Sequence, residues 1–179
     1  MRTKGGDHNS YKSPDSVNQL DYNRKAQYMD NVEYFKGLIE LRKAHPAFRM
    51  PEASLIRAHL KFLYMPSANM VGYTLSGNAN DDKWETIVVL TNANDEDIEV
   101  ELDQSGWAVV VNGEQAGVEV IEKISGNTVI VPARTLLVLV DQGSIGSNLW
   151  IYLLLFALGA GAGGFVYWQK TKKNVKETA

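Results

Sequence analysis

The sequence contains no cysteine, which excludes a disulfide framework and any metal site built on thiolates. Histidine is nearly as scarce, since the chain has only His8, His45 and His59, far apart in sequence. A lone histidine is more often structural than a metal ligand. We therefore expect no metal and no other cofactor.

An excess of positive charge is also absent, because the formal net charge is -3 at pH 7. The last eleven residues hold four lysines and one glutamate, so the preceding residues carry -6. This balance argues against a nucleic-acid partner. Residues 2–21 are polar and lack the basic and apolar stretches of a signal peptide, so export would need a signal upstream of them.

The first half of the sequence predicts a loop followed by helices. Residues 1–23 are polar and contain the turn signal Ser13-Pro14-Asp15, which favours a long loop of the kind that often carries function. Residues 24–44 place Tyr28, Val32, Phe35 and Ile39 at helical spacing, and Pro46 ends the helix. A short helix is expected at residues 52–57.

Short runs of β-forming residues follow, separated by turn residues such as Asn112-Gly113, the strongest hairpin signal in the chain. Their spacing is typical of an antiparallel β-sandwich. The acidic stretch 92–97 lacks the spacing and closing glutamate of a calcium loop, so we expect an ordinary solvated turn. The predicted strands are residues 60–64, 70–75, 86–91, 98–102, 107–111, 118–124, 128–131 and 136–140.

The end of the sequence predicts a membrane anchor. After a polar linker at residues 142–148, residues 149–168 contain no charge, which is enough for a helix to cross a bilayer. Aromatic residues lie near both ends of this stretch, and lysines follow it in the tail 169–179. Positive charge stays on the cytoplasmic side, so we expect a single-pass protein of the cell membrane with the β domain outside and the tail in the cytoplasm.

Two stretches resemble type I pullulanases of the α-amylase clan. The first is GDHNSYKSPD at residues 6–15, followed by NQLDY at residues 18–22; it is similar to the segment after the eighth barrel strand. The second is YFKGLIELRKAHPAFR at residues 34–49, which is similar to the last barrel helix. The resemblance continues through residues 84–92, 109–113 and 132–140, which look like the β domain that follows the barrel.

The resemblance implies hydrolysis of α-1,6 linkages in pullulan or branched α-glucans with retention of configuration. Such chemistry needs two carboxyl groups about 5 to 5.5 Å apart, and the family carries them on barrel strands upstream of these motifs. No catalytic residue is therefore expected in this chain. By the same resemblance, the substrate-binding residues are Asn9, Tyr11, Asp15 and Asn18, although Asp15 and Asn18 also suit a role in capping turns.

Together these observations predict a mainly β fold with helices. Residues 1–49 are expected to be the last loop and helix of a (β/α)8 barrel, residues 50–141 the antiparallel β-sandwich, and residues 149–168 one transmembrane helix. The expected partners are a branched α-glucan or pullulan, bound only together with the upstream barrel, and the membrane. Two alternatives remain: a stand-alone membrane-tethered sandwich that binds glucan or protein without catalysis, and the non-functional product of a truncated reading frame.

Overall fold

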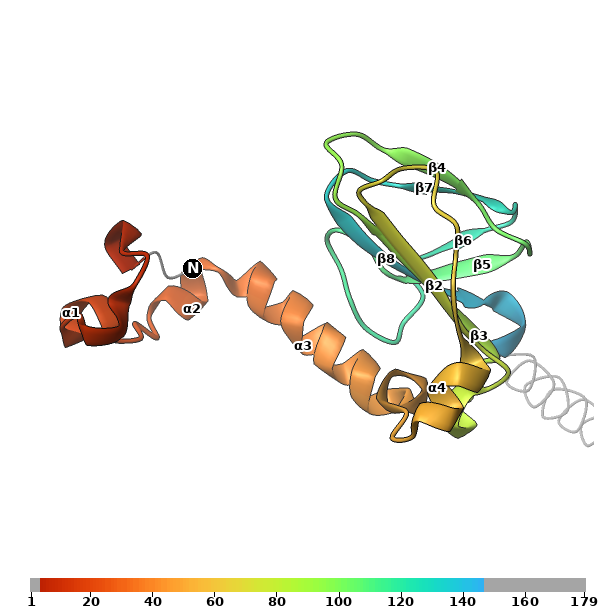
Figure 1. Cartoon of the computed structure of the whole chain (residues 1–179), viewed down its shortest axis with the longest axis horizontal. Helices are drawn as coiled ribbons and strands as arrows, with labels where there is room; N and C mark the ends of the chain where they lie inside the picture. The colour runs from red at the N-terminus through yellow and green to blue at the C-terminus, as the bar shows by residue number, and fades with distance from the viewer. Residues whose placement is uncertain (1–3, 147–179) are drawn as a thin grey trace, which may run out of the picture. The chain divides into compact units, whose positions relative to one another are not determined.

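The computed structural model describes residues 4–146, and within them eight strands form two antiparallel sheets (Figure 1). The larger sheet has the strand order β1-β2-β3-β8-β5-β6, and the smaller pairs β4 with β7. The predicted strand positions are confirmed with small shifts at their ends, except that the predicted strand 118–124 is formed only at Glu122–Ile124. The strands are β1 (Leu60–Phe62), β2 (Met70–Ser76), β3 (Thr86–Asn92), β4 (Ile98–Glu101), β5 (Trp107–Val111), β6 (Glu122–Ile124), β7 (Thr128–Val131) and β8 (Thr135–Asp141).

One hydrophobic core lies between the two sheets, as the alternation of side chains along each strand requires. The large sheet contributes alternate residues of β2, β3, β8 and β5, and the small sheet contributes Val100, Val129 and Val131. Leu90, Val109 and Leu139 are completely buried in this core. The predicted antiparallel β-sandwich is thus confirmed.

Helices precede the sandwich. They are α1 (Asp15–Asn18), α2 (Arg24–Gln27), α3 (Met29–Ala44) and α4 (Ala53–His59). The predicted helix 24–44 is interrupted at Tyr28, whose φ of −122° and ψ of 40° leave the helical region. Short 3-10 turns complete the described chain: η1 (Lys4–Gly6), η2 (Ser10–Lys12), η3 (Pro46–Arg49), η4 (Ala79–Asp81) and η5 (Gln142–Ser144).

The segment between β5 and β6 departs from the predicted strand 118–124, because only Glu122–Ile124 pair with β5 as a regular strand. The chain reverses at Asn112, where the side-chain Oδ1 accepts hydrogen bonds from the backbone N–H groups of Glu114 and Gln115. A single bridge then joins Val111 to Ala116. Beyond it, the backbone N–H groups of Gly117 and Ile121 still donate to the carbonyl oxygens of Val110 and Val109 in β5, while the backbone at Ala116 lies against α3.

None of the helices within residues 4–146 is long and apolar enough to cross a membrane. The predicted membrane helix 149–168 and the tail 169–179 lie outside the described residues.

Candidate functional site

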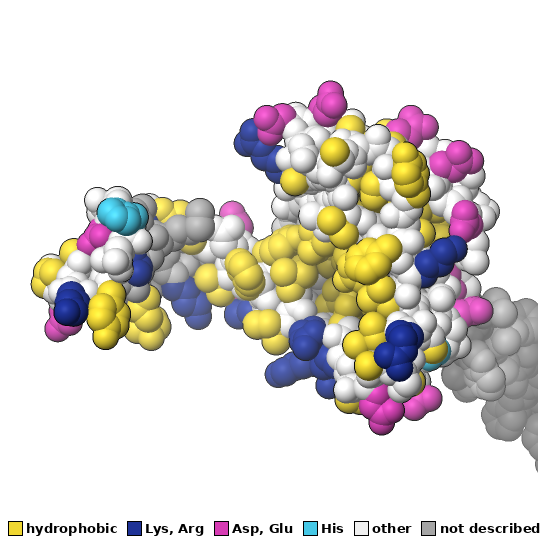
Figure 2. All heavy atoms as spheres, in the orientation of Figure 1, with side chains coloured by type: hydrophobic (Ala, Val, Ile, Leu, Met, Phe, Trp, Pro, Cys, Tyr) yellow, Lys and Arg dark blue, Asp and Glu magenta, His cyan; other side chains and the backbone are white. Residues whose placement is uncertain are grey.

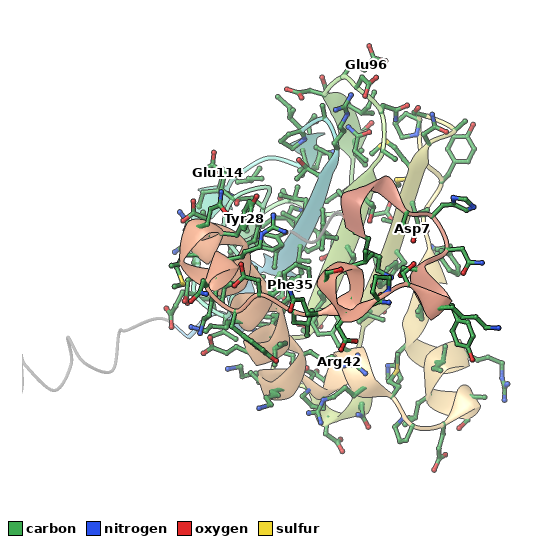
Figure 3. The ribbon with its side chains drawn as sticks, turned by 90° about the vertical axis from the view of Figure 1, so that its left-hand side faces the viewer. Asp7, Tyr28, Phe35, Arg42, Glu96 and Glu114 are labelled. Carbon is green, nitrogen blue, oxygen red and sulfur yellow. The ribbon has the colours of Figure 1, made fainter. Side chains whose placement is uncertain are left out.

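The N-terminal segment that carries the predicted substrate contacts is held together by side-chain hydrogen bonds within the segment. The Asp7 carboxylate accepts hydrogen bonds from the Ser13 hydroxyl at 2.6 Å and from the Asn9 backbone N–H at 2.9 Å. These bonds lower the pKa of Asp7, the serine bond contributing most. Asp7, labelled in Figure 3, is thus hydrogen-bonded to the residues on both sides of η2.

The four predicted substrate-binding residues lie close together in sequence within this loop, but they differ in their freedom to bind a ligand. Tyr11 is the most available, since its side chain is 86% exposed. Asn9 is exposed, and Asp15 is exposed in the first turn of α1. Asn18 instead donates its amide to the carbonyl oxygens of Ser10 and Ser13, at 2.7 and 2.9 Å.

A groove of about 800 Å³ runs beside this loop, between residues 4–21 and the exposed side of α2 and α3. Its apolar wall is the helical stripe predicted from sequence, of which Phe35 remains 65% and Ile39 56% exposed. None of the four predicted substrate-binding residues lines it. Hydrophobic side chains gather along α3 in Figure 2. An exposed apolar surface of this kind marks a site of interaction.

The opposite side of α3 packs on the sandwich. Tyr34 donates its hydroxyl hydrogen to the carbonyl oxygen of Asn112, at 3.0 Å, and burial raises the pKa of this tyrosine. One turn further on, Gly37 lies against the backbone of Ala116. The sequence did not reveal this contact, because a glycine adds nothing to a hydrophobic pattern.

A buried polar cluster joins the end of α3 to the turn before β3. Asp82 Oδ1 lies 2.8 Å from His45 Nδ1 and accepts the Trp84 backbone N–H, while Asp82 Oδ2 accepts the Ala47 backbone N–H. The His45 ring stacks on Trp84 with ring centroids 3.2 Å apart. The structural role expected for a lone histidine therefore describes His45.

No group of three or more histidine, cysteine or carboxylate side chains that could hold a metal ion occurs in residues 4–146. The acidic residues after β3 are used within the protein: Asp95 pairs with Arg134 at 2.6 Å, and Asp97 accepts the backbone N–H of Ala133. Within these residues, the stretch 92–97 is a hydrogen-bonded turn.

Residues 56–115 match the family model described as the pullulanase all-beta domain. A pullulanase of Bacillus subtilis strain 168 is 42% identical over 99 residues, which are 55% of this chain and 14% of that protein. Pullulanase A of Streptococcus pneumoniae strain TIGR4 is 31% identical over 87 residues, 41% of this chain and 7% of that protein.

Solved structures agree with these matches. The pullulanase from Bacillus acidopullulyticus superimposes with a TM-score of 0.73 at 43% identity, over 78% of this chain and 17% of that one. The type I pullulanase of Bacillus subtilis strain 168, solved with maltose, gives a TM-score of 0.69 at 34% identity, over 78% of this chain and 19% of that one. The predicted resemblance to type I pullulanases is therefore confirmed, and the chain spans less than a fifth of the length of these relatives.

Proposed function

We propose that this chain is part of a pullulanase-like glycoside hydrolase that acts on α-1,6 linkages of α-glucans. The observation that carries the proposal is the superposition on the pullulanase from Bacillus acidopullulyticus, which extends over 78% of the chain at 43% identity. The match to the all-beta domain covers only residues 56–115. The likeness to the solved pullulanases thus extends beyond that domain.

In this proposal the chain supports catalysis rather than performing it. Retaining hydrolysis needs a nucleophile and an acid held about 5 to 5.5 Å apart on rigid elements. The Asp7 carboxylate is already bonded to Ser13 and Asn9, and burial does not raise its pKa into the range of a catalytic acid. We therefore assign the catalytic carboxylates to the barrel of the whole protein.

The apolar side of α3 fits the same proposal. Val32, Phe35 and Ile39 face the groove, and two of them are more than half exposed. A helix at the end of a barrel would bury this stripe against the neighbouring barrel helices. The loop 4–23 would then extend from the barrel toward the substrate, with Tyr11 and Asn9 free to contact glucan and Asn18 holding the loop in shape.

A chimera tests the function. Residues 4–146 replace the matching segment of the Bacillus acidopullulyticus pullulanase, and reducing sugar released from pullulan is measured. We expect hydrolysis by the chimera and none by the present chain alone. In the chimera, Tyr11→Ala should raise KM about fivefold, because an aromatic contact with a sugar is worth about 1 kcal/mol.

Tyr64→Ala is the matched control, since Tyr64 is 97% exposed but lies in the β domain. Its KM should equal that of the unmodified chimera. A folded chimera without activity would contradict the proposed function. Hydrolysis by the present chain alone would place catalytic groups within it, and equal KM values for the two tyrosine variants would remove Tyr11 from the substrate contacts.

We further propose that residues 149–168 anchor the protein in the cell membrane with the β domain outside. The support is the uncharged run, its flanking aromatic residues and the lysines that follow. Protease treatment of intact cells should digest residues before 142 and leave the tail 169–179 protected. Digestion of the tail with protection of the β domain would reverse the orientation, and release of the whole chain by washing would exclude the anchor.

A further inference from the structure

The buried cluster at the end of α3 contains a histidine whose charge state the fold restricts. The side chains of His45 and Asp82 are both completely buried. His45 Nδ1 bonds Asp82 Oδ1, and the ring is stacked on Trp84. His45 Nε2 is buried without a hydrogen-bond partner.

This geometry favours the neutral ring. A neutral ring that donates Nδ1–H to Asp82 leaves only an acceptor at Nε2, whereas a protonated ring would place an N–H donor there with nothing to receive it. A buried donor without a partner costs about 1 to 3 kcal/mol, and more when it is charged. The Asp82 carboxylate cannot turn toward Nε2 without releasing the backbone N–H groups of Ala47 and Trp84.

The charges around the ring act in opposite directions. Burial is the largest influence and lowers the pKa of His45, Asp82 raises it through its hydrogen bond and its charge, Lys83 lowers it, and the net shift of the pKa is downward. The other charged side chains of the elements packed here, on α3, η3, η4 and α4, are exposed to solvent and therefore act weakly. They are Asp30, Glu33, Lys36, Glu40, Arg42, Lys43, Arg49, Asp81 and Arg57. The titratable His59 of α4 is half-buried and bonded to the carbonyl oxygen of Ser76.

The cluster lies where the chain passes from α3 into the β domain. Asp82 is bonded to two residues 35 and 37 positions earlier, on both sides of the Pro46 bend. Leu41 is buried one turn before His45, and the contacts of α3 with the sandwich at Tyr34 and Gly37 lie two or more turns away. Besides the bonds of Asp82, the Asn80 amide donates to the Pro46 carbonyl oxygen at 2.9 Å. Loss of the bonds of Asp82 would therefore leave residues 45–49 held to the β domain by this one described hydrogen bond, and these residues could open without unfolding of the sheets.

We propose that His45, Asp82 and Trp84 form a pH-operated latch that releases residues 45–49 and the end of α3 from the sandwich at weakly acidic pH. When the latch opens, His45 is solvated and takes up a proton near its ordinary pKa of 6.5, while the closed latch binds the proton only at lower pH. The closed state is therefore fully stabilised above pH 6.5. The free-energy difference that favours the closed state over the open one falls as the pH drops below 6.5 toward the lower pKa of His45 in the closed state.

Hydrogen exchange of residues 45–50 in the full chain tests the latch, with rates corrected for the intrinsic effect of pH. The equilibrium constant for opening should rise by up to about tenfold per pH unit below pH 6.5, as expected for uptake of one proton. In His45→Asn the amide can replace Nδ1 as the donor to Asp82 but cannot titrate. This variant should lose the dependence on pH.

Two controls separate His45 from the other histidines. His8 is exposed, and His59 of α4 is bonded to the carbonyl oxygen of Ser76 at 2.7 Å. In His8→Asn and in His59→Asn the equilibrium constant for opening should therefore rise below pH 6.5 as it does in the wild type. The proposal is overturned if wild-type exchange shows no rise, if His45→Asn keeps it, or if His59→Asn abolishes it.

If His45→Asn fails to fold, an NMR titration of isotope-labelled histidine in the wild-type chain tests the latch instead. The His45 signal is identified by its contact with Trp84. A titration midpoint below 6.5 supports the latch. A midpoint at or above 6.5 overturns it, because proton uptake would then not favour opening.

Discussion

Replacing Gly37 by alanine should destabilise the protein by about 2 to 3 kcal/mol, although alanine is the better helix former by about 1 kcal/mol. A Cβ at this position would overlap the carbonyl oxygen of Ala116 and lie 2.5 Å from its carbonyl carbon. Both are backbone atoms, so no side chain can rotate away. The helix or the turn must therefore move. Tyr34 lies three residues before Gly37, so its hydrogen bond to Asn112 should be lost when they move.

Gly117→Ala is the matched control, because a Cβ there meets nothing within 4 Å although the residue borders the same contact. We expect the free energy of unfolding of this variant to change by less than about 0.5 kcal/mol. Urea unfolding followed by circular dichroism measures both free energies. Equal stabilities of the two variants, or a gain in Gly37→Ala, would show that α3 does not approach the turn so closely.

The two sides of α3 show what a hydrophobic pattern can and cannot reveal. The predicted stripe exists, and it includes Phe35 and Ile39, which stay more than half exposed. The side that packs on the sandwich is marked by Gly37 and Leu41, both buried. The glycine contact depends on the distance between two backbones, which spacing along the sequence does not contain. Hence the sequence predicted the helix and one apolar side but not its partner in the fold.

The strands were easier to predict, because burial on one face imposes a period of two on the sequence. This holds for β7, where Val129 and Val131 are buried and Ile130 is exposed. It does not hold for β5, which is buried on both faces and reads as a continuous apolar run. The separation of β4 and β7 into a sheet of their own follows from contacts between distant segments.

Residues 1–23 were predicted as a loop, which is wrong for Asp15–Asn18 because they form the short helix α1. The hydrogen bonds within the segment were not predicted. The sequence offered Asp15 and Asn18 as either substrate contacts or turn caps, and Asn18 donates to two carbonyl oxygens within the segment. Nothing in the composition distinguishes such an amide from the free one of Asn9. The boundary predicted between residues 49 and 50 stays a prediction, although the bonds of His45 and Ala47 to Asp82 cross it.

Asn92 is a further residue whose role only the fold reveals. The sequence predicted a solvated turn from residue 92 onward, yet Asn92 is 1% exposed at the end of β3. Its amide donates to the carbonyl oxygens of Glu96, Val131 and Pro132. Its Oδ1 accepts the backbone and side-chain N–H groups of Asn94. One side chain thus joins the turn to the end of β7.

We therefore expect Asn92→Ala to lower the free energy of unfolding by about 3 to 5 kcal/mol. Alanine leaves the Val131 carbonyl buried without this donor, and each buried group without a partner costs about 1 to 3 kcal/mol. Asn92→Asp should be at least as damaging, because a carboxylate would face the same carbonyl oxygens that the amide now satisfies.

Asn127→Ala serves as the control, since Asn127 makes a single exposed side-chain bond to Glu101 at 3.1 Å and should change stability by less than about 0.5 kcal/mol. Urea unfolding of the three variants gives the comparison. The aspartate variant separates two explanations of the result. If shape alone mattered, Asn92→Asp would be nearly as stable as the wild type, because it has almost the same volume. If the donated hydrogen bonds matter, as the geometry requires, it will unfold at least as easily as Asn92→Ala, and protonation of the aspartate at low pH should restore part of its stability.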